Sequence, residues 1–169
     1  MQSHEYNGRE IANFVLDFCS GKGIPVTNLS LQKIVYFCHV WSLIELGRPL
    51  VKQQFEAWEH GPVLQYLYRE FKAFGSDPIT VRAQKMDCVT GKIKPAEYKF
   101  DSETGELLSR IVDFYSRLTG SQLRNLSHAM GGPWETVWNH KESVSPGMYI
   151  SNDEILEFYS RSPSPFSVQ

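Results

Sequence analysis

The sequence predicts a mainly α-helical protein of the α+β class, with about six or seven helices and a small accessory β-sheet. Apolar residues recur at helical spacing over most of the chain, which is the main signal of amphipathic helices. Glycine and proline residues separate these segments, as they commonly do at helix ends. Alternation of apolar and polar residues, the strand signal, is confined to short stretches. Without an internal repeat or a long linker, we expect one domain over residues 1–160 and a flexible tail over residues 161–169.

Two helices are predicted in the N-terminal part of the chain. From residue 9 to about residue 19, apolar side chains recur three and four positions apart, and Gly21 follows as a terminator. Thr27 is placed to cap the next helix, which runs from about residue 29 to residue 46 and ends at Gly47. This second helix is apolar nearly all round, so we expect it at the buried centre of the domain.

A short strand and a third helix are predicted next. In residues 53–59, Phe55 and Ala57 alternate with Glu56 and Trp58, which is the pattern of a half-buried strand. Proline is common at the first helical position, so Gly61-Pro62 predicts the start of a helix. Apolar residues at helical spacing then continue to Gly75, where this helix is expected to end.

Residues 76–100 predict a small sheet. A strand is indicated at residues 79–82, a turn at Thr90-Gly91, and a second alternating segment at residues 97–100. We therefore expect the accessory sheet between the third and fourth helices.

The remainder of the chain predicts four more helices. An amphipathic helix runs from about residue 103 to residue 118, with Gly120 as its left-handed exit residue. Ser121 is placed to cap a shorter helix, and Pro133 to start another. The last helix opens with Ser151-Asn152-Asp153-Glu154, in which the serine and glutamate side chains each satisfy a free backbone N–H of the first turn.

Charge and cysteine content limit the kinds of binding partner and the cellular compartment that we expect for this protein. Lys and Arg total 17 against 19 Asp and Glu, and no concentrated basic stripe occurs, which argues against nucleic acid as the partner. The Arg117–Arg124 region, with its Gly120 turn, vaguely resembles a helix-turn-helix, but the neighbouring charge is mixed. Three widely spaced cysteines, no secretion signal at the start and no long apolar run predict a cytoplasmic protein outside the membrane.

The sequence shows no pattern of residues suited to catalysis, a metal or a cofactor. Its five histidines, at positions 4, 39, 60, 128 and 140, lack the spacing of a metal site, and no nucleophile or phosphate-binding motif is present. We expect His39 to be a hydrogen-bonded core residue. His128 falls near a helix C-terminus, where the helix dipole favours a protonated ring. We therefore expect neither an enzyme nor a cofactor.

Two sequence blocks resemble a known family. Residues 29–37 read LSLQKIVYF, and residues 47–50 and 55–63 read GRPL and FEAWEHGPV, followed by Tyr68. In order and spacing these are similar to the "L-x-L-Q-K-L-L-Y", "G-x-P-L", "F-x-A-W-x-x-G-P-V" and "V-Y" motifs of the Panacea-domain (SocA-like, GepA-like) antitoxins. Downstream, LSH at residues 126–128 and PW at residues 133–134 resemble two weaker family motifs. The resemblance covers about residues 9–160, while residues 76–100 match no family motif.

The resemblance implies an antitoxin of a bacterial or prophage toxin–antitoxin system. Such a protein neutralises a cognate protein toxin, encoded by an adjacent gene, through direct contact, and homo-oligomer formation is left open. The candidate toxin-binding or family-motif residues are Gln32, Lys33, Tyr36, Glu56, Trp58, His60, Gly61, Pro62 and Tyr68. We expect the interface to include the second helix, a strand edge at Trp58 and the Gly61-Pro62 turn.

Two questions stay open at the level of sequence. Gln32, Lys33 and Tyr36 interrupt an apolar helix, so they either join a buried polar network with Glu56 or the Trp58 N–H, or they line a groove. The alternative function is a small-molecule-binding or enzymatic domain with a pocket near Lys33, Tyr36 and His60, beside an anion-binding helix start at Gly61. Solid packing of those side chains would count against the pocket.

Overall fold

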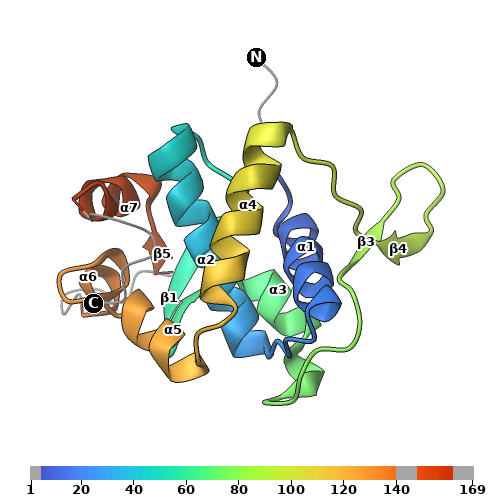
Figure 1. Cartoon of the computed structure of the whole chain (residues 1–169), viewed down its shortest axis with the longest axis horizontal. Helices are drawn as coiled ribbons and strands as arrows, with labels where there is room; N and C mark the ends of the chain where they lie inside the picture. The colour runs from blue at the N-terminus through green and yellow to red at the C-terminus, as the bar shows by residue number, and fades with distance from the viewer. Residues whose placement is uncertain (1–4, 140–147, 162–169) are drawn as a thin grey trace.

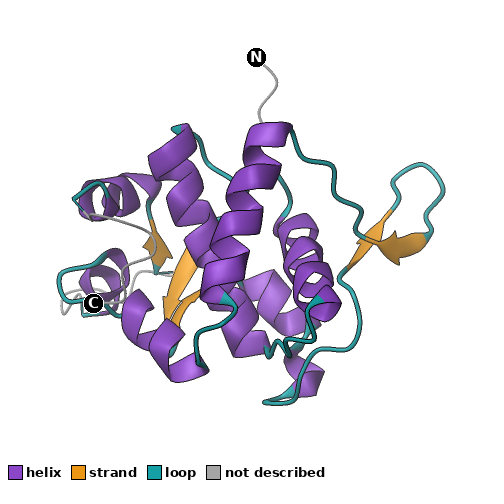
Figure 2. Ribbon diagram, in the orientation of Figure 1, coloured by secondary structure: helices purple, strands orange, loops and turns teal. Residues whose placement is uncertain are grey.

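The computed structural model describes residues 5–139 and 148–161 (Figure 1). Seven α-helices within these residues confirm the predicted mainly α class, and two small antiparallel sheets accompany them (Figure 2). The helices are α1 Gly8–Gly21, α2 Asn28–Trp41, α3 Gln65–Glu70, α4 Ser102–Tyr115, α5 Gly120–Ser127, α6 Pro133–Trp138 and α7 Asn152–Tyr159. Among the described helices, none has both the length and the apolar character needed to cross a membrane. The predicted flexible tail lies outside the described residues, apart from Arg161.

Helix α2 is the buried centre of the fold, as predicted. It contacts α1, α4, α5 and α7, and its side chains from Leu31 to Trp41 are all buried. Figure 1 shows α2 in the middle of the molecule, with α4 crossing in front of it. The Thr27 side chain caps its first turn by accepting a hydrogen bond from the Ser30 N–H. The helix continues as a π-helical turn, Ser42–Leu46, and ends at the left-handed Gly47.

The sheet next to α2 contains three strands in the order β2-β1-β5. Strand β1, Phe55–Trp58, is the middle strand, and it pairs with β2, Gly61–Val63, and with β5, Tyr149–Ile150. Phe55 and Ala57 are buried while Glu56 and Trp58 are half-buried, which confirms the predicted alternation. Strand β1 has a neighbour on each side, but its register with β5 covers only Phe55 and Glu56, and within the described residues Trp58 pairs only with Gly61 of β2. The strand edge expected at Trp58 therefore stays a prediction.

The predicted helix start at Gly61-Pro62 was wrong. These residues form β2, and helix α3 begins only at Gln65. Strand β2 lies at the edge of its sheet, where a proline without an N–H is tolerated. Gly61 has φ +116°, a backbone conformation that residues other than glycine rarely adopt. Because no helix begins at Gly61, the expected anion-binding helix start at this residue was wrong as well.

Residues 76–100 contain the predicted small sheet, but its strands lie elsewhere. Strands β3, Gln84–Met86, and β4, Ile93–Pro95, form a hairpin whose turn includes the predicted Thr90-Gly91. Residues 79–82 and 97–100 are not strands. The hairpin, which we call the arm, projects from the body of the protein (Figure 1). All six residues of its two strands are exposed, so the burial pattern that marks a strand in the sequence is missing.

The C-terminal helices agree with the prediction except at Gly120. This residue is the first of α5 rather than a left-handed exit from α4, and Thr119 rather than Ser121 is the N-cap. Thr119 and Gln122 form a reciprocal capping box, which satisfies two free N–H groups at this helix start. Pro133 opens α6, and the Ser151–Glu154 capping box opens α7, as predicted.

The buried Asn13 side chain fixes the base of the arm to α1. Its Nδ2 donates to the carbonyl oxygens of Ala83 (3.0 Å) and Ala96 (2.9 Å), and its Oδ1 accepts from the Ala83 N–H (2.7 Å). Ala83 and Ala96 flank the two strands and are both buried. One side chain thus holds both ends of the arm.

Asn13→Ala is expected to lower the free energy of unfolding by about 1 to 3 kcal/mol, because it leaves buried backbone groups without partners. Hydrogen exchange at the arm should rise more than exchange in α2, since only the arm loses its attachment. Asn125→Ala, at an exposed position of α5, is the matched control and should change stability little. Unchanged protection of the arm in Asn13→Ala would contradict this role.

Candidate protein-binding site

The nine candidate residues separate into a buried group and a surface group. Gln32, Lys33 and Tyr36 on α2, and Gly61 and Pro62 on β2, are all buried and form what we call the motif core. The others lie on or beside strand β1 with at least part of the side chain accessible, and we call them the sheet patch: Glu56, Trp58, His60 and Tyr68. A residue buried in the motif core does not touch a partner in this conformation.

Gln32 holds the segment that connects β2 to α3. Its Oε1 accepts from the Leu64 N–H (3.1 Å), and its Nε2 donates to Asn28 Oδ1 (3.1 Å). Asn28 Nδ2 in turn donates to the Tyr68 carbonyl oxygen (3.0 Å). Both polar ends of the buried amide are therefore satisfied, which favours the buried network over the groove.

Lys33 reaches the same segment from the next position of α2. Its side chain is fully buried, and its Nζ donates to the Pro62 carbonyl oxygen (3.0 Å). Burial, with a smaller effect from nearby Arg124, lowers the pKa of Lys33 to about 7. No carboxylate within the described residues forms an ion pair with this ammonium group. The expected partners Glu56 and Trp58 bond each other instead, through Trp58 Nε1 and Glu56 Oε2 (2.7 Å).

Gly61 lets the Lys33 side chain pass. A Cβ atom at Gly61 would lie 2.5 Å from Lys33 Cε and 2.7 Å from Ser127 Oγ, closer than a Cβ atom approaches non-bonded atoms in proteins. Ser127 Oγ donates to the Arg124 carbonyl oxygen (2.8 Å), so its position is set by α5. Three residues from separate family motifs therefore meet at one point: Gly61, Lys33 and Ser127.

The remaining downstream motifs join the same cluster. The His128 ring stacks on Trp134, with centroids 3.5 Å apart and an angle of 3° between the rings. Trp134 is 7% exposed, and its Nε1 donates to the Trp58 carbonyl oxygen (2.7 Å). Motifs separated by about a hundred residues in the family pattern are thus one packed unit.

His128 differs electrostatically from the sequence prediction. Burial, together with the positive charges of Arg124 and Lys33, lowers its pKa to about 4. Although it is the C-cap residue of α5, desolvation and repulsion outweigh the dipole, and the ring is neutral near pH 7.

His39 is the hydrogen-bonded core histidine that we expected: its Nε2 lies 2.8 Å from Asn152 Oδ1, and its Nδ1 accepts from the Leu50 and Val51 N–H groups.

Solid packing around Tyr36 and Lys33 removes support for a pocket there. Tyr36 is fully buried, with its ring edge-on to Phe37 and Phe55, and burial raises the pKa of its hydroxyl. His60 is exposed on the turn between β1 and β2.

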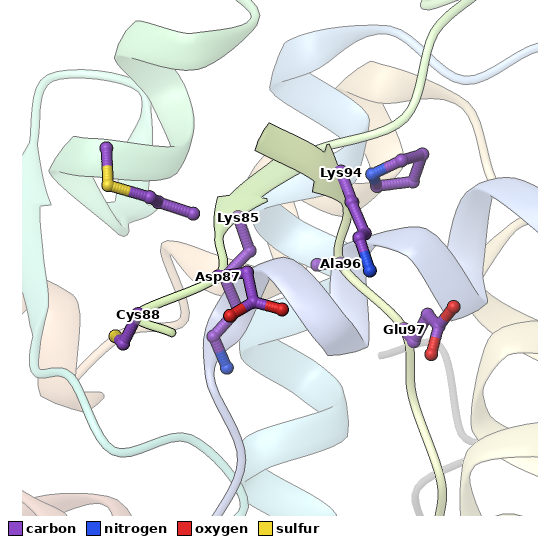
Figure 3. A pocket seen from close by; sticks show the side chains of 8 residues that line it. Lys85, Asp87, Cys88, Lys94, Ala96 and Glu97 are labelled. Atoms are coloured by element: carbon purple, nitrogen blue, oxygen red, sulfur yellow. The ribbon is translucent and has the colours of Figure 1, made fainter. Parts of the chain in front are cut away.

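A pocket of about 380 Å³ is found instead on the arm, where Lys85, Asp87, Lys94 and Glu97 are among its lining residues (Figure 3). The described residues contain no cluster of three or more His, Cys, Asp or Glu suited to a metal ion.

The sheet patch presents aromatic side chains in fixed orientations. Trp58 packs edge-on against Tyr68, with ring centroids 5.1 Å apart, while Glu56 holds its indole N–H. Tyr149 on β5 pairs with Glu56 and is 52% exposed, which extends the patch. Sequence reasoning missed Tyr149, because a two-residue strand is too short to show alternation.

Comparisons with known proteins agree with these motifs. Residues 31–135 match the family model described as antitoxin SocA-like, Panacea domain, a span that contains every part of the motif core. The curated protein Antitoxin SocA of Caulobacter vibrioides (strain NA1000 / CB15N) is 41% identical over 133 residues, covering 79% of this chain and 71% of that protein. No solved structure matches the chain. The chain therefore belongs to the SocA-like antitoxin family that is defined by the Panacea domain.

Proposed function

We propose that this protein is the antitoxin of a bacterial or prophage toxin–antitoxin system, and that it neutralises a cognate protein toxin through direct contact. The observation that carries the proposal is the 41% identity to Antitoxin SocA, together with the family match that spans the whole motif core. The toxin would be encoded by an adjacent gene and be met in the cytoplasm.

The motif core supports this function as a scaffold. Gln32 and Lys33 bond the backbone of Leu64 and Pro62, and Gly61 leaves room for the lysine. These contacts fix the β1–β2 hairpin and the start of α3 relative to α2. The second helix therefore has no direct part in the interface that we propose, because its motif side chains are buried.

The sheet patch is the part of the family motif that is available for contact. Tryptophan and tyrosine are enriched among the residues that dominate binding energy, since they bury a large apolar area with few rotatable bonds. Trp58 and Tyr68 are held against each other before any partner arrives, which reduces the entropy cost of binding. A stable interface needs roughly 20 residues on each side, so the patch forms only its centre.

Growth of cells that express the protein encoded by the adjacent gene tests the proposal. We expect growth arrest when that protein is produced alone, and normal growth when this chain is produced with it. The two proteins should also purify together. Arrest that this chain does not relieve, or relief without any complex, would refute neutralisation by direct contact.

Trp58→Ala is expected to raise the Kd for the toxin by about tenfold or more, because the tryptophan supplies the largest apolar ring of the patch. The measurement is a titration of purified toxin with each variant, alongside a thermal unfolding curve. Phe18→Ala is the matched control, since Phe18 is a half-buried aromatic residue on α1 rather than in the sheet patch. Equal losses of affinity in both variants would show that Trp58 acts through stability alone.

A further inference from the structure

The arm carries an apolar pair on one of its faces. The strand register places Met86 directly opposite Ile93, and these side chains are 61% and 67% exposed. Val89 in the connecting turn is 94% exposed. Three large apolar side chains are thus open to solvent on one small element, although burying each would be favourable.

The other face of the arm carries two lysines side by side. Lys85 lies directly opposite Lys94 in the register, and like charges at such positions repel each other. Within the described part of the chain, neither ammonium group forms an ion pair. Figure 3 shows both lysines around the arm pocket, with Asp87 and Glu97 at the same site. This repulsion is a cost that an anionic partner would remove.

The arm keeps this shape through contacts at its base and its tip. Asn13 holds the base, and the Gln84 N–H donates to Glu70 Oε1 (2.6 Å). At the tip, Asp87 Oδ1 accepts from the Val89 and Thr90 N–H groups (2.8 and 3.1 Å). A two-stranded sheet is only marginally stable by itself, so these contacts present an ordered hairpin rather than a loose loop.

We propose that the arm is a docking element for an acidic, partly apolar segment of the toxin, with carboxylates at the Lys85–Lys94 pair and apolar side chains at the Met86–Ile93 pair. This inference rests on the proposed function and names a second contact surface for the same partner. A partner of that chemistry relieves the lysine repulsion and covers the exposed apolar pair in one step.

The charged and apolar faces together decide against the other occupants of this surface. A second copy packed on the apolar pair would cover Met86 and Ile93 but leave the Lys85–Lys94 repulsion on the opposite face. Nucleic acid offers phosphates to the lysine pair but no apolar side chains to cover the exposed Met86 and Ile93. The acidic protein segment is the occupant that fits both faces.

The double substitution Lys85→Glu with Lys94→Glu tests the arm. It reverses the sign of the pair, and hydrogen exchange at the arm checks that the hairpin of the variant stays ordered. We expect the Kd for the adjacent-gene toxin to rise by about tenfold or more and the salt dependence of binding to change. Lys52→Glu with Lys72→Glu is the control, because both lysines are exposed on the body and the net charge changes by the same amount. Lys85→Gln with Lys94→Gln should weaken binding less than the charge reversal.

The outcomes separate the two proposals. A wild-type complex that the arm reversal leaves at full affinity overturns the docking role alone. Failure of the wild-type chain to bind or neutralise the toxin overturns the antitoxin proposal, and the docking role with it. Equal losses in the arm and control variants, or retardation of a DNA or RNA fragment that depends on Lys85 and Lys94, would also refute an acidic protein segment as the occupant.

Discussion

Gly61→Ala is expected to lower the free energy of unfolding by about 2 to 5 kcal/mol, because it combines overpacking with backbone strain. The new Cβ would lie 2.5 Å from Lys33 Cε and 2.7 Å from Ser127 Oγ, and both side chains are buried with their polar atoms hydrogen-bonded. The φ of +116° adds a conformational cost for any residue with a Cβ. Urea unfolding followed by tryptophan fluorescence measures the effect, since Trp58 and Trp134 lie beside the site.

Gly105→Ala provides the control for this experiment. Gly105 is in helix α4, and a Cβ there meets nothing within 4 Å. Alanine is favoured over glycine inside helices, so this variant should be as stable as the wild type or more so. A Gly61→Ala variant as stable as the wild type would show that the lysine has room to move, and the close approach would lose its importance.

Lys33→Met is expected to change how stability depends on pH. The folded-state pKa of Lys33 is about 7, while the unfolded chain keeps a value near 10.5. Between these values the unfolded chain binds a proton that the folded protein does not, so Lys33 makes the wild type more stable as pH rises. Relative to Lys33→Met, the wild type should therefore gain up to about 1.4 kcal/mol per pH unit between pH 7 and 10.

The comparison between the two proteins isolates this lysine. The buried tyrosines and cysteines also titrate at high pH, but they are common to both proteins and cancel in the difference. Loss of the hydrogen bond to Pro62 lowers the stability of Lys33→Met by the same amount throughout this pH range. Lys52→Met, at an exposed position, should show no such trend. A constant difference between wild type and Lys33→Met would mean that Lys33 stays charged when buried.

The pattern of apolar residues was sufficient for the elements that bury at least one face. Helix α2 was placed at the centre because it is apolar all round, and β1 was identified from the alternation of Phe55 and Ala57 with Glu56 and Trp58. The arm was misplaced because its strands bury nothing, so their sequence contains no alternation with respect to a core. Gly61-Pro62 matched the rule for helix starts, but sequence alone does not show the backbone φ at Gly61.

The motif identified residues of the site without showing their roles. Whether Gln32 and Lys33 line a groove or bond the backbone depends on Leu64 and Pro62, which lie about thirty residues away along the chain. Only the folded arrangement of β2 against α2 settles that question, in favour of a buried network. The same arrangement leaves Trp58 and Tyr68 accessible, and it adds Tyr149, which no sequence pattern marked.

Inhibition of the purified toxin by the purified chain is the most direct test of the central claim. The toxin protein from the adjacent gene is assayed for its activity while this chain is added, with no other cellular component present. Direct neutralisation predicts that activity falls to zero as a stable complex forms at fixed stoichiometry, and that Trp58→Ala shifts the curve to higher concentration. Full toxin activity in the presence of excess chain, with no complex between the two purified proteins, would contradict neutralisation by contact.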